Sequence, residues 1–176
     1  MRAVLRRTCV VIVFVLTACG KSGKLVPLLP DAPTGWSAEG QPQNHDVHGV
    51  GYSSMKSYVS AGSTTGSKGQ RVQVQILAFE EGANKDDVRK MYLGGDHAGL
   101  WESTTVNGFD AADSFDFTGQ SYYSRVVYPN KTTLVQIIAF FGEGDPNTGL
   151  DKMDEGKKIV QVFSDKMDFK QIAALK

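Results

Sequence analysis

Histidine and acidic side chains cluster early in the sequence, where they offer atoms that bind metals. His45, Asp46 and His48 lie within four residues, and Asp96-His97 adds a third imidazole and another carboxylate. Zinc and copper are bound by such groups, so the set forms a metal site if the fold brings its members together. Alternatively, the first pair lies in a polar, exposed loop. We favour the loop, expect no metal or other cofactor, and keep His45, His48 and His97 as candidate ligands.

Four carboxylates offer a second chemistry, that of a small hydrolase. Glu102, Asp110, Asp113 and Asp116 are close together in the sequence, and many hydrolases use one carboxyl group as the acid and another as the base or nucleophile. The alternative is a strand that carries its acidic residues on the solvent face. The chain contains no Gly-x-Ser-x-Gly motif for a serine nucleophile. We therefore expect no enzyme and assign no catalytic residue.

Two loops match ion-binding motifs only in part. Residues 145–151 place side-chain oxygens at the first, third and seventh positions of a calcium loop, but Gly156 stands where an EF-hand needs a bidentate glutamate. Residues 62–68 have the glycines and hydroxyls of a phosphate loop, but their spacing differs and strands are expected on both sides. We expect both segments to be connecting loops.

The first nineteen residues have the three-part organisation of an export signal. Three arginines open it, an apolar run from Cys9 to Leu16 follows, and small residues precede Cys19. That run is shorter than the roughly 20 residues that span a bilayer. Leu16-Thr17-Ala18-Cys19 resembles the lipobox of bacterial lipoproteins, in which the cysteine receives lipid and becomes the new N-terminus. The resemblance implies that residues 1–18 are a signal peptide and that acyl chains such as palmitate anchor the mature protein through Cys19.

The same resemblance implies a location. In lipoproteins that are sorted between two membranes, the residue after the cysteine directs the sorting, and Gly20 is not the aspartate that causes retention. We expect the protein in the bacterial cell envelope, facing the periplasm, and in the outer membrane rather than the inner one. The alternative is an ordinary secretory signal whose cleavage site happens to include a cysteine.

Cysteine usage and charge exclude several kinds of site and partner. Cys9 and Cys19 are the two cysteines, so after processing the folded part has no thiol for a disulfide, a cysteine nucleophile or a zinc site. The chain has 19 basic and 19 acidic residues, and removal of three arginines with the signal leaves the mature protein mildly acidic. That sign argues against nucleic acid as a partner and against attraction to anionic lipid.

The segment after the cysteine has the composition of a linker. Pro27, Pro30 and Pro33 recur at every third position among glycine, serine and lysine, which is typical of an extended, polyproline-like spacer. We therefore divide the chain into a signal peptide (1–18), a lipid-attached cysteine with a flexible linker (19–34) and one globular domain (35–176). Trp36 is expected in the core of that domain.

Hydrophobic periodicity predicts the elements of the domain. Alternation predicts strands over 50–60 and 71–79, and Asn107-Gly108 is typical of a type I′ hairpin turn. The apolar run over 132–141 predicts a central strand covered on both faces. Helical spacing predicts a helix of about fourteen residues from Leu150. The remaining expectations are strands over 102–106, 110–117 and 122–128, a helix over 85–93, and a short final helix or turn near 169–175.

These elements predict an α+β fold, a mainly antiparallel sheet with helices packed on it. The layout resembles the α/β/α sandwich of PsbP-like and DcrB-like small envelope proteins. The motifs that carry this resemblance are Pro33-x-Gly35-Trp36, the strand Val72 to Ile76, Val106-Asn107-Gly108-Phe109-Asp110-Ala111, and Asp168-x-x-x-Ile172-Ala173-Ala174-Leu175. The resemblance implies an accessory or binding role and transfers no functional residue.

Three classes of function follow from these observations. We expect a membrane-anchored accessory module that binds an envelope protein, with contacts through loops at Gln41 to His48 and Gly142 to Gly149. A periplasmic binder of a small ligand or metal is the first alternative, and a small hydrolase is the second. We favour the accessory module because it needs no set of catalytic or ligand-binding residues, whereas the other two classes need a set that the sequence does not show.

Overall fold

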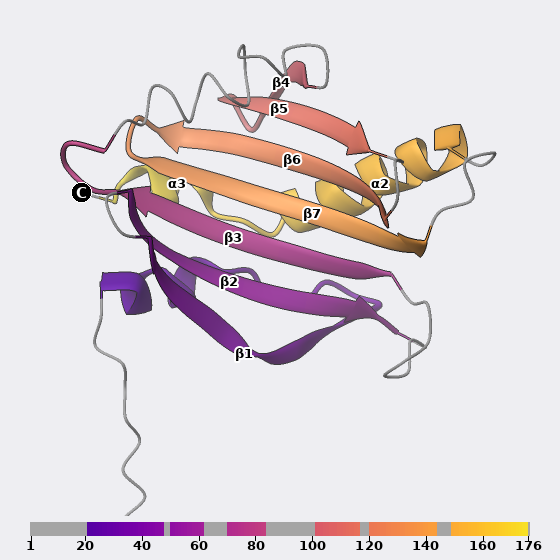
Figure 1. Cartoon of the computed structure of the whole chain (residues 1–176), viewed down its shortest axis with the longest axis horizontal. Helices are drawn as coiled ribbons and strands as arrows, with labels where there is room; N and C mark the ends of the chain where they lie inside the picture. The colour runs from indigo at the N-terminus through magenta and orange to yellow at the C-terminus, as the bar shows by residue number, and fades with distance from the viewer. Residues whose placement is uncertain are drawn as a thin grey trace, which may run out of the picture.

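Alternation of apolar and polar residues places most of the middle of the chain in strands. The computed structural model describes residues 21–47, 50–61, 70–83, 101–116, 120–143 and 149–175. Its strands form one seven-stranded sheet in the order β1-β2-β3-β7-β6-β5-β4 (Figure 1). The strands are β1 (Trp36–Val47), β2 (Gly51–Ser60), β3 (Arg71–Phe79), β4 (Glu102–Val106), β5 (Phe109–Asp116), β6 (Gln120–Asn130) and β7 (Thr133–Glu143).

Two meanders meet at the centre of this sheet. β1, β2 and β3 are neighbours in sequence order, as are β4 to β7, and β3 pairs with β7 between the two groups. Every neighbouring pair is antiparallel. The predicted α+β class with a mainly antiparallel sheet in one domain is therefore confirmed. The predicted strands over 50–60, 71–79, 102–106, 110–117, 122–128 and 132–141 are all present, with ends shifted by a few residues.

The Asn107-Gly108 turn joins β4 to β5 as predicted. Asn107 has φ 52° and Gly108 has φ 84°, and a type I′ turn requires positive φ at both central positions. Val106 and Phe109 are register partners directly next to this turn. The turn therefore fixes the register of the β4–β5 hairpin, including the pairing of Glu102 with Asp113.

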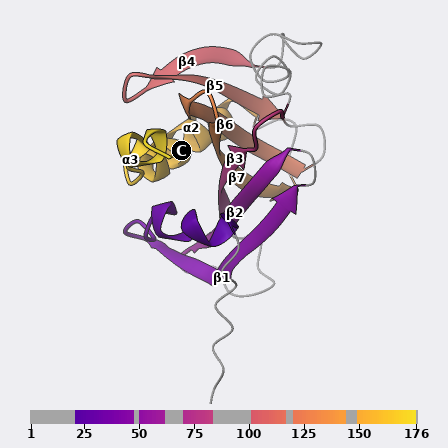
Figure 2. The same ribbon diagram turned by 90° about the vertical axis from the view of Figure 1, so that its left-hand side faces the viewer.

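Helices cover one face of the sheet, which we call the first face. α2 (Gly149–Ser164) packs on β6 and β7, and α3 (Phe169–Ala173) packs on β6. Figure 2 shows the sheet curving around both of them. The Asp168 carboxylate caps α3 by accepting a hydrogen bond from the Gln171 backbone N–H at 2.9 Å. Both α-helices that the structure describes at this end of the chain were predicted.

The main core lies between α2, α3 and the first face. Strand alternation sends Val72, Val74 and Ile76 of β3 to this side, and their neighbours on β7 are Val135, Ile137 and Ala139. Val160, Phe163 and Ile172 close the core from the helices. Trp36 is half-buried and its ring meets that of Phe163 edge-on at 5.2 Å, so it packs against the core as expected.

A smaller apolar cluster lies on the opposite face of the sheet, which we call the second face. Its buried members are Phe79, Val126, Tyr128 and Leu134, and Ala83 and Trp101 pack against it among other half-buried residues. Leu134 and Val135 are thus buried on opposite faces of β7. The prediction of a strand covered on both faces is confirmed for the first half of β7. Towards the other end of β7, Ile138 and Phe140 on the second face are only partly buried.

The prediction of a flexible linker over residues 19–34 is wrong for residues 21–34, the part that the structure describes. η1 (Lys21–Lys24) and η2 (Val26–Leu28) are short 3-10 helices, and between and after them Leu25 (0% exposed) and Leu29 (7%) belong to the main core. The physical reason is that burial of these two apolar side chains in the main core outweighs the extended preference of the nearby prolines. The globular part therefore includes residues from Lys21 onward, and Pro30 and Pro33 are buried as well.

Hydrogen bonds fix this N-terminal segment to β2. The Ser54 hydroxyl donates to the Ser22 carbonyl at 2.7 Å, and the Tyr58 hydroxyl donates to the Pro30 carbonyl at 2.5 Å. Burial, with a smaller contribution from the charge of Asp31, raises the pKa of Tyr58. Two separate contacts therefore hold the beginning and the end of the segment in place.

The expected loop over residues 41–48 is also wrong, because residues 41–47 belong to the edge strand β1. The pairing of β1 with β2 shifts register between Glu39 and Gln43, and Gly40 in that interval has φ 72°. The shift is a β-bulge, in which extra residues bend the strand. Pro42 lies within it and has no N–H to donate, a position that proline tolerates on an edge strand.

A glycine lets α2 approach β6 closely. Gly156 is buried, and a Cβ atom at this position would lie 2.4 Å from Cβ of Tyr123. The same atom would lie 3.1 Å from the ring of Phe141. Only a residue without a side chain fits here, so this glycine sets the distance between helix and sheet over the buried polar groups described next.

Candidate functional site

Strand alternation separates the carboxylates that were considered as a hydrolytic pair. Asp113 lies on the first face, opposite Arg125 in the β5–β6 register. Asp110 and Asp116 have the opposite parity on β5 and lie on the second face. Glu102 is the β4 partner of Asp113 but is exposed. The four residues therefore do not form one site. The alternative, a strand that carries its acidic residues on the solvent face, is wrong for Asp113, which is buried.

Asp113 instead forms a buried ion pair under α2. Arg125 donates from Nε to Asp113 Oδ1 and from Nη2 to Asp113 Oδ2, both at 2.7 Å. The side chains are 4% and 8% exposed respectively. The Tyr123 hydroxyl donates to the same carboxylate at 2.9 Å. Both carboxylate oxygens thus accept hydrogen bonds in a bidentate arrangement, the strongest geometry for such a pair.

Two side chains of α2 complete this network. Arg125 Nη1 donates to the Gln161 side-chain oxygen at 2.6 Å and to the Ser164 hydroxyl at 3.4 Å. Ser164 in turn donates to the Val160 carbonyl at 2.7 Å. The guanidinium therefore joins β5, β6 and α2 through charge-assisted hydrogen bonds. Because these bonds join two strands to the helix, the network stabilises the packing of α2 on the sheet.

Burial and the ion pair both shift the pKa values of Arg125 and Tyr123. Burial alone lowers the pKa of Arg125, but the hydrogen bonds and charge of Asp113 outweigh it and raise that pKa. Burial is also the largest cause that raises the pKa of Tyr123, with the charge of Asp113 adding to it. Arg125 therefore stays charged and Tyr123 stays neutral across the physiological range.

Of the three candidate histidines, the structure describes His45 alone. It lies on β1 opposite Ser53, on the second face, and is exposed. His48 and His97 lie outside the described residues. Among the described ranges no three histidine, cysteine, aspartate or glutamate side chains lie close enough to hold a metal ion. The expectation that the first histidine pair lies in a loop is corrected for His45, which is part of a strand.

Several other expectations fall on residues that the structure does not describe. These are Cys19 with the signal segment, the loop over 62–68, the helix over 85–93 and residues 145–148 of the calcium-like loop. Gly149 to Asp151, the end of that loop, begins α2, and Gly142 with Glu143 ends β7. No helix in the described part of the chain is long and apolar enough to cross a membrane.

The described chain begins at one end of the sheet, which we call the Lys21 end. Lys21 donates to Glu80 at 2.9 Å, and this hydrogen bond and charge raise the pKa of Lys21. Asp46 at the end of β1 and Lys131 in the β6–β7 turn lie at the same end. The C-terminal Leu175 is there too, beside the start of β7 (Figure 1).

A hollow of about 230 Å³ opens at the Lys21 end. Tyr52, Phe79 and Leu175 supply apolar walls, and Glu80 supplies a carboxylate at the rim. The Thr133 hydroxyl belongs to this wall, is buried, and has no hydrogen-bond partner among the described residues. The hollow is therefore mixed in character, and Glu80 is already occupied by Lys21.

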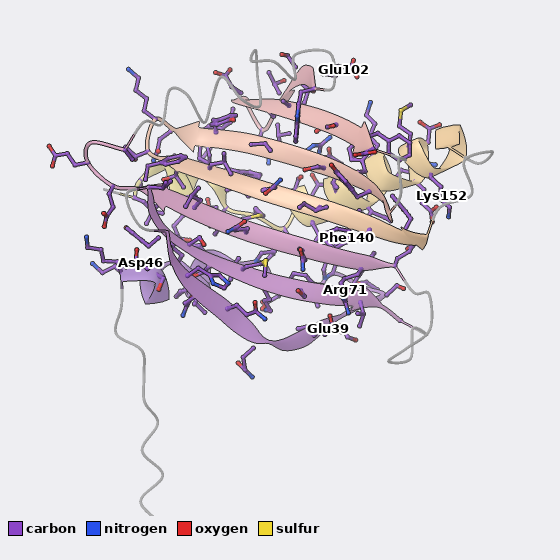
Figure 3. All side chains as sticks on the ribbon, in the orientation of Figure 1. Glu39, Asp46, Arg71, Glu102, Phe140 and Lys152 are labelled. Carbon is purple, nitrogen blue, oxygen red and sulfur yellow. The ribbon has the colours of Figure 1, made fainter. Side chains whose placement is uncertain are left out.

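A row of side chains crosses the second face at the opposite end of the sheet, where β1 begins at Trp36. Four of them are half-buried and Arg71 is exposed. Register places Val59, Arg71, Phe140, Tyr122 and Asp116 side by side on five neighbouring strands. The rings of Tyr122 and Phe140 lie 6.3 Å apart, and Arg71 donates to Glu39 at 3.0 Å. Figure 3 labels Arg71 and Phe140 at this end and Asp46 at the other. We call these five residues the distal row.

Sequence reasoning missed both Arg125 and the distal row. Arg125 is a charged residue at a position of β6 whose neighbours of the same parity, Tyr123 and Val127, are buried. A charge at such a position signals a buried partner on the adjacent strand. Comparison with known proteins adds no assignment, because no family model, no curated protein and no solved structure matches this chain.

Proposed function

We propose that the protein is a lipoprotein of the bacterial cell envelope, anchored through lipid on Cys19, that binds an envelope protein and performs no catalysis. It faces the periplasm, and we favour the outer membrane over the inner one. The observation that supports binding is the distal row, which presents aromatic and charged side chains while both described α-helices cover the other face. Aromatic residues and arginine supply most of the binding energy of protein interfaces.

We further propose the PsbP-like or DcrB-like α/β/α sandwich as the complete architecture. It requires a helical layer on the second face in addition to α2 and α3. Ala83 and Trp101 both pack against the cluster on that face, so the chain leaves and returns there. Residues 85–93, for which the sequence predicts a helix, lie between them.

Replacement of Cys19 by Ala tests the anchor. We expect the variant to incorporate no fatty-acid analogue and to move from the membrane fraction to the soluble fraction, because one buried acyl chain binds marginally and two or three bind stably. Cys9→Ala is the matched control, since this residue leaves with the signal peptide and the variant should remain labelled. Labelling of Cys19→Ala equal to that of the control would refute lipid attachment at Cys19.

A photo-crosslinking residue at position 140 tests the binding surface. We expect a defined crosslinked product in living cells when benzoylphenylalanine replaces Phe140, because the ring lies in the distal row. The same residue at Val162, which is 42% exposed on α2, is the control and should give no such product. Phe140→Ala should weaken the complex by roughly 30-fold, as loss of an interface hot spot does. Equal crosslinking at both positions would refute the assignment of this face.

A second candidate function is the binding of a small ligand in the hollow at the Lys21 end. The Thr133 hydroxyl in its wall, which has no hydrogen-bond partner in the described part of the chain, favours this candidate, since buried polar groups normally have partners. A stoichiometric small molecule found by mass spectrometry of the protein purified from its own envelope would support it. The hydrolase alternative gains no support from the geometry, because Asp113 is held in an ion pair with Arg125 on the first face, whereas Asp110 and Asp116 lie on the second.

A further inference from the structure

We propose that the Lys21 end of the sheet lies directly on the bilayer that holds the lipid, with the distal row directed away from it. The inference rests on the proposed lipid anchor at Cys19. The surface concerned is made by Lys21, Glu80 and Lys131 together with the exposed residues beside them. Its partner is the head-group layer of the protein's own membrane, and the contact is enforced by a tether that is too short to allow any other position.

The fixed position of Lys21 is the first step of the argument. Leu25, four residues later, is fully buried in the main core, and Ser22 accepts a hydrogen bond from Ser54 on β2. Lys21 itself pairs with Glu80 at 2.9 Å. Three contacts to three different parts of the fold thus hold the start of the described chain against the sheet. The folded domain therefore includes Lys21.

The length of the tether is the second step. Only Gly20 lies between Cys19 and Lys21, and an extended chain spans at most about 3.6 Å per residue. The Cα atoms of Cys19 and Lys21 are thus no more than about 7 Å apart. A lipid on Cys19 therefore keeps Lys21 at the level of the head groups. A flexible linker up to residue 34, as the sequence suggested, would have allowed the domain to move freely above the membrane.

The direction of the sheet is the third step. β3 ends at Phe79, next to Glu80, and begins at Arg71 in the distal row. Its nine residues span about 30 Å at the rise of an extended strand. The Lys21 end carries lysines as well as Asp46 and Glu80, so its charge does not attract lipid by itself. The tether therefore sets the position of the domain on the bilayer. A partner must then reach the distal row from the periplasmic side.

The test uses energy transfer to the bilayer in the full lipidated protein. Glu81→Cys and Asp154→Cys place single fluorophores on exposed residues of the same charge, beside Glu80 and in the first half of α2 respectively. The folded part has no other cysteine. In phosphatidylcholine vesicles with an acceptor-labelled lipid, transfer should be several times more efficient from position 81 than from position 154. Equal transfer from both would overturn the inference.

A second variant separates the tether from any affinity of the surface. Fifteen glycine and serine residues inserted between Gly20 and Lys21 give a flexible chain with a mean reach of about 20 Å. We expect the difference between positions 81 and 154 to be largely lost, and an undiminished difference would overturn the tether as its cause. Mass spectrometry of the same samples keeps the two proposals apart. Absence of lipid refutes the proposed function, whereas equal transfer from a lipidated protein refutes only the orientation.

Discussion

Deletion of residues 21–30 should remove most of the stability of the domain. The loss should be about 4 kcal/mol or more, since each buried leucine that is removed from a core costs about 2–5 kcal/mol, and Leu25 and Leu29 are both buried. The deletion also leaves the Tyr58 hydroxyl without the Pro30 carbonyl. A domain of this size is stable by only about 5–15 kcal/mol. Urea denaturation followed by circular dichroism measures the shift of the midpoint.

Two controls identify the cause of that loss. Deletion of the residues before Lys21 should leave the midpoint unchanged. Leu25→Ala and Leu28→Ala form a matched pair, because Leu25 is fully buried and Leu28 is only half-buried in the same short segment. The first should destabilise the protein clearly more than the second. An unchanged midpoint after deletion of residues 21–30 would show that this segment is a linker after all.

Asp113→Ala is expected to destabilise the protein by about 3–5 kcal/mol, because it leaves the charge of Arg125 buried without a partner. The guanidinium is 4% exposed and donates two hydrogen bonds to that carboxylate. Denaturant unfolding of the purified domain measures the change. Glu39→Ala is the control, since its partner Arg71 is half-exposed, and breaking an exposed ion pair costs about 1 kcal/mol or less.

A double variant distinguishes loss of the pair from loss of packing. Asp113→Leu combined with Arg125→Met removes both charges and replaces them with apolar side chains. Buried pairs exchanged in this way often leave stability nearly unchanged, whereas removal of one partner does not. We expect the double variant to be more stable than Asp113→Ala. If it is instead less stable than Asp113→Ala, the network contributes more than the burial of two compensated charges.

The sequence predicted the strands and helices whose apolar residues recur at a regular period. β3 alternates from Val72 to Ala78, and α2 repeats its apolar residues at helical spacing, so one buried face is visible in each. β1 was missed because it forms an edge of the sheet and is polar on both faces around Asn44, with Gly40 and Pro42 in its middle. An edge strand needs no apolar face, and its bulge resembles a turn in sequence.

The N-terminal segment was misinterpreted for a different reason. Its 3-10 pieces have three or four residues each, too few to show a period, and Pro27 and Pro30 have the spacing of an extended spacer. The packing of Leu25 against the sheet shows that this segment is part of the core, and the sequence alone does not show that packing. Likewise, Arg125 and Asp113 are twelve positions apart, and their contact depends on the register of β5 and β6. Register follows from hairpin geometry and could not be derived from residue types alone.

The bulge in β1 disfavours edge-to-edge association of the sheet with the sheet of a second copy. An edge strand of twelve residues exposes a row of backbone groups on which another strand can add, and such addition leads to aggregation. Here the shift of register between Glu39 and Gln43 breaks that row in the middle, and Pro42 removes one of its donors. Neither half of β1 then offers a long, straight edge. Addition of a strand from a second copy along this edge is thereby disfavoured.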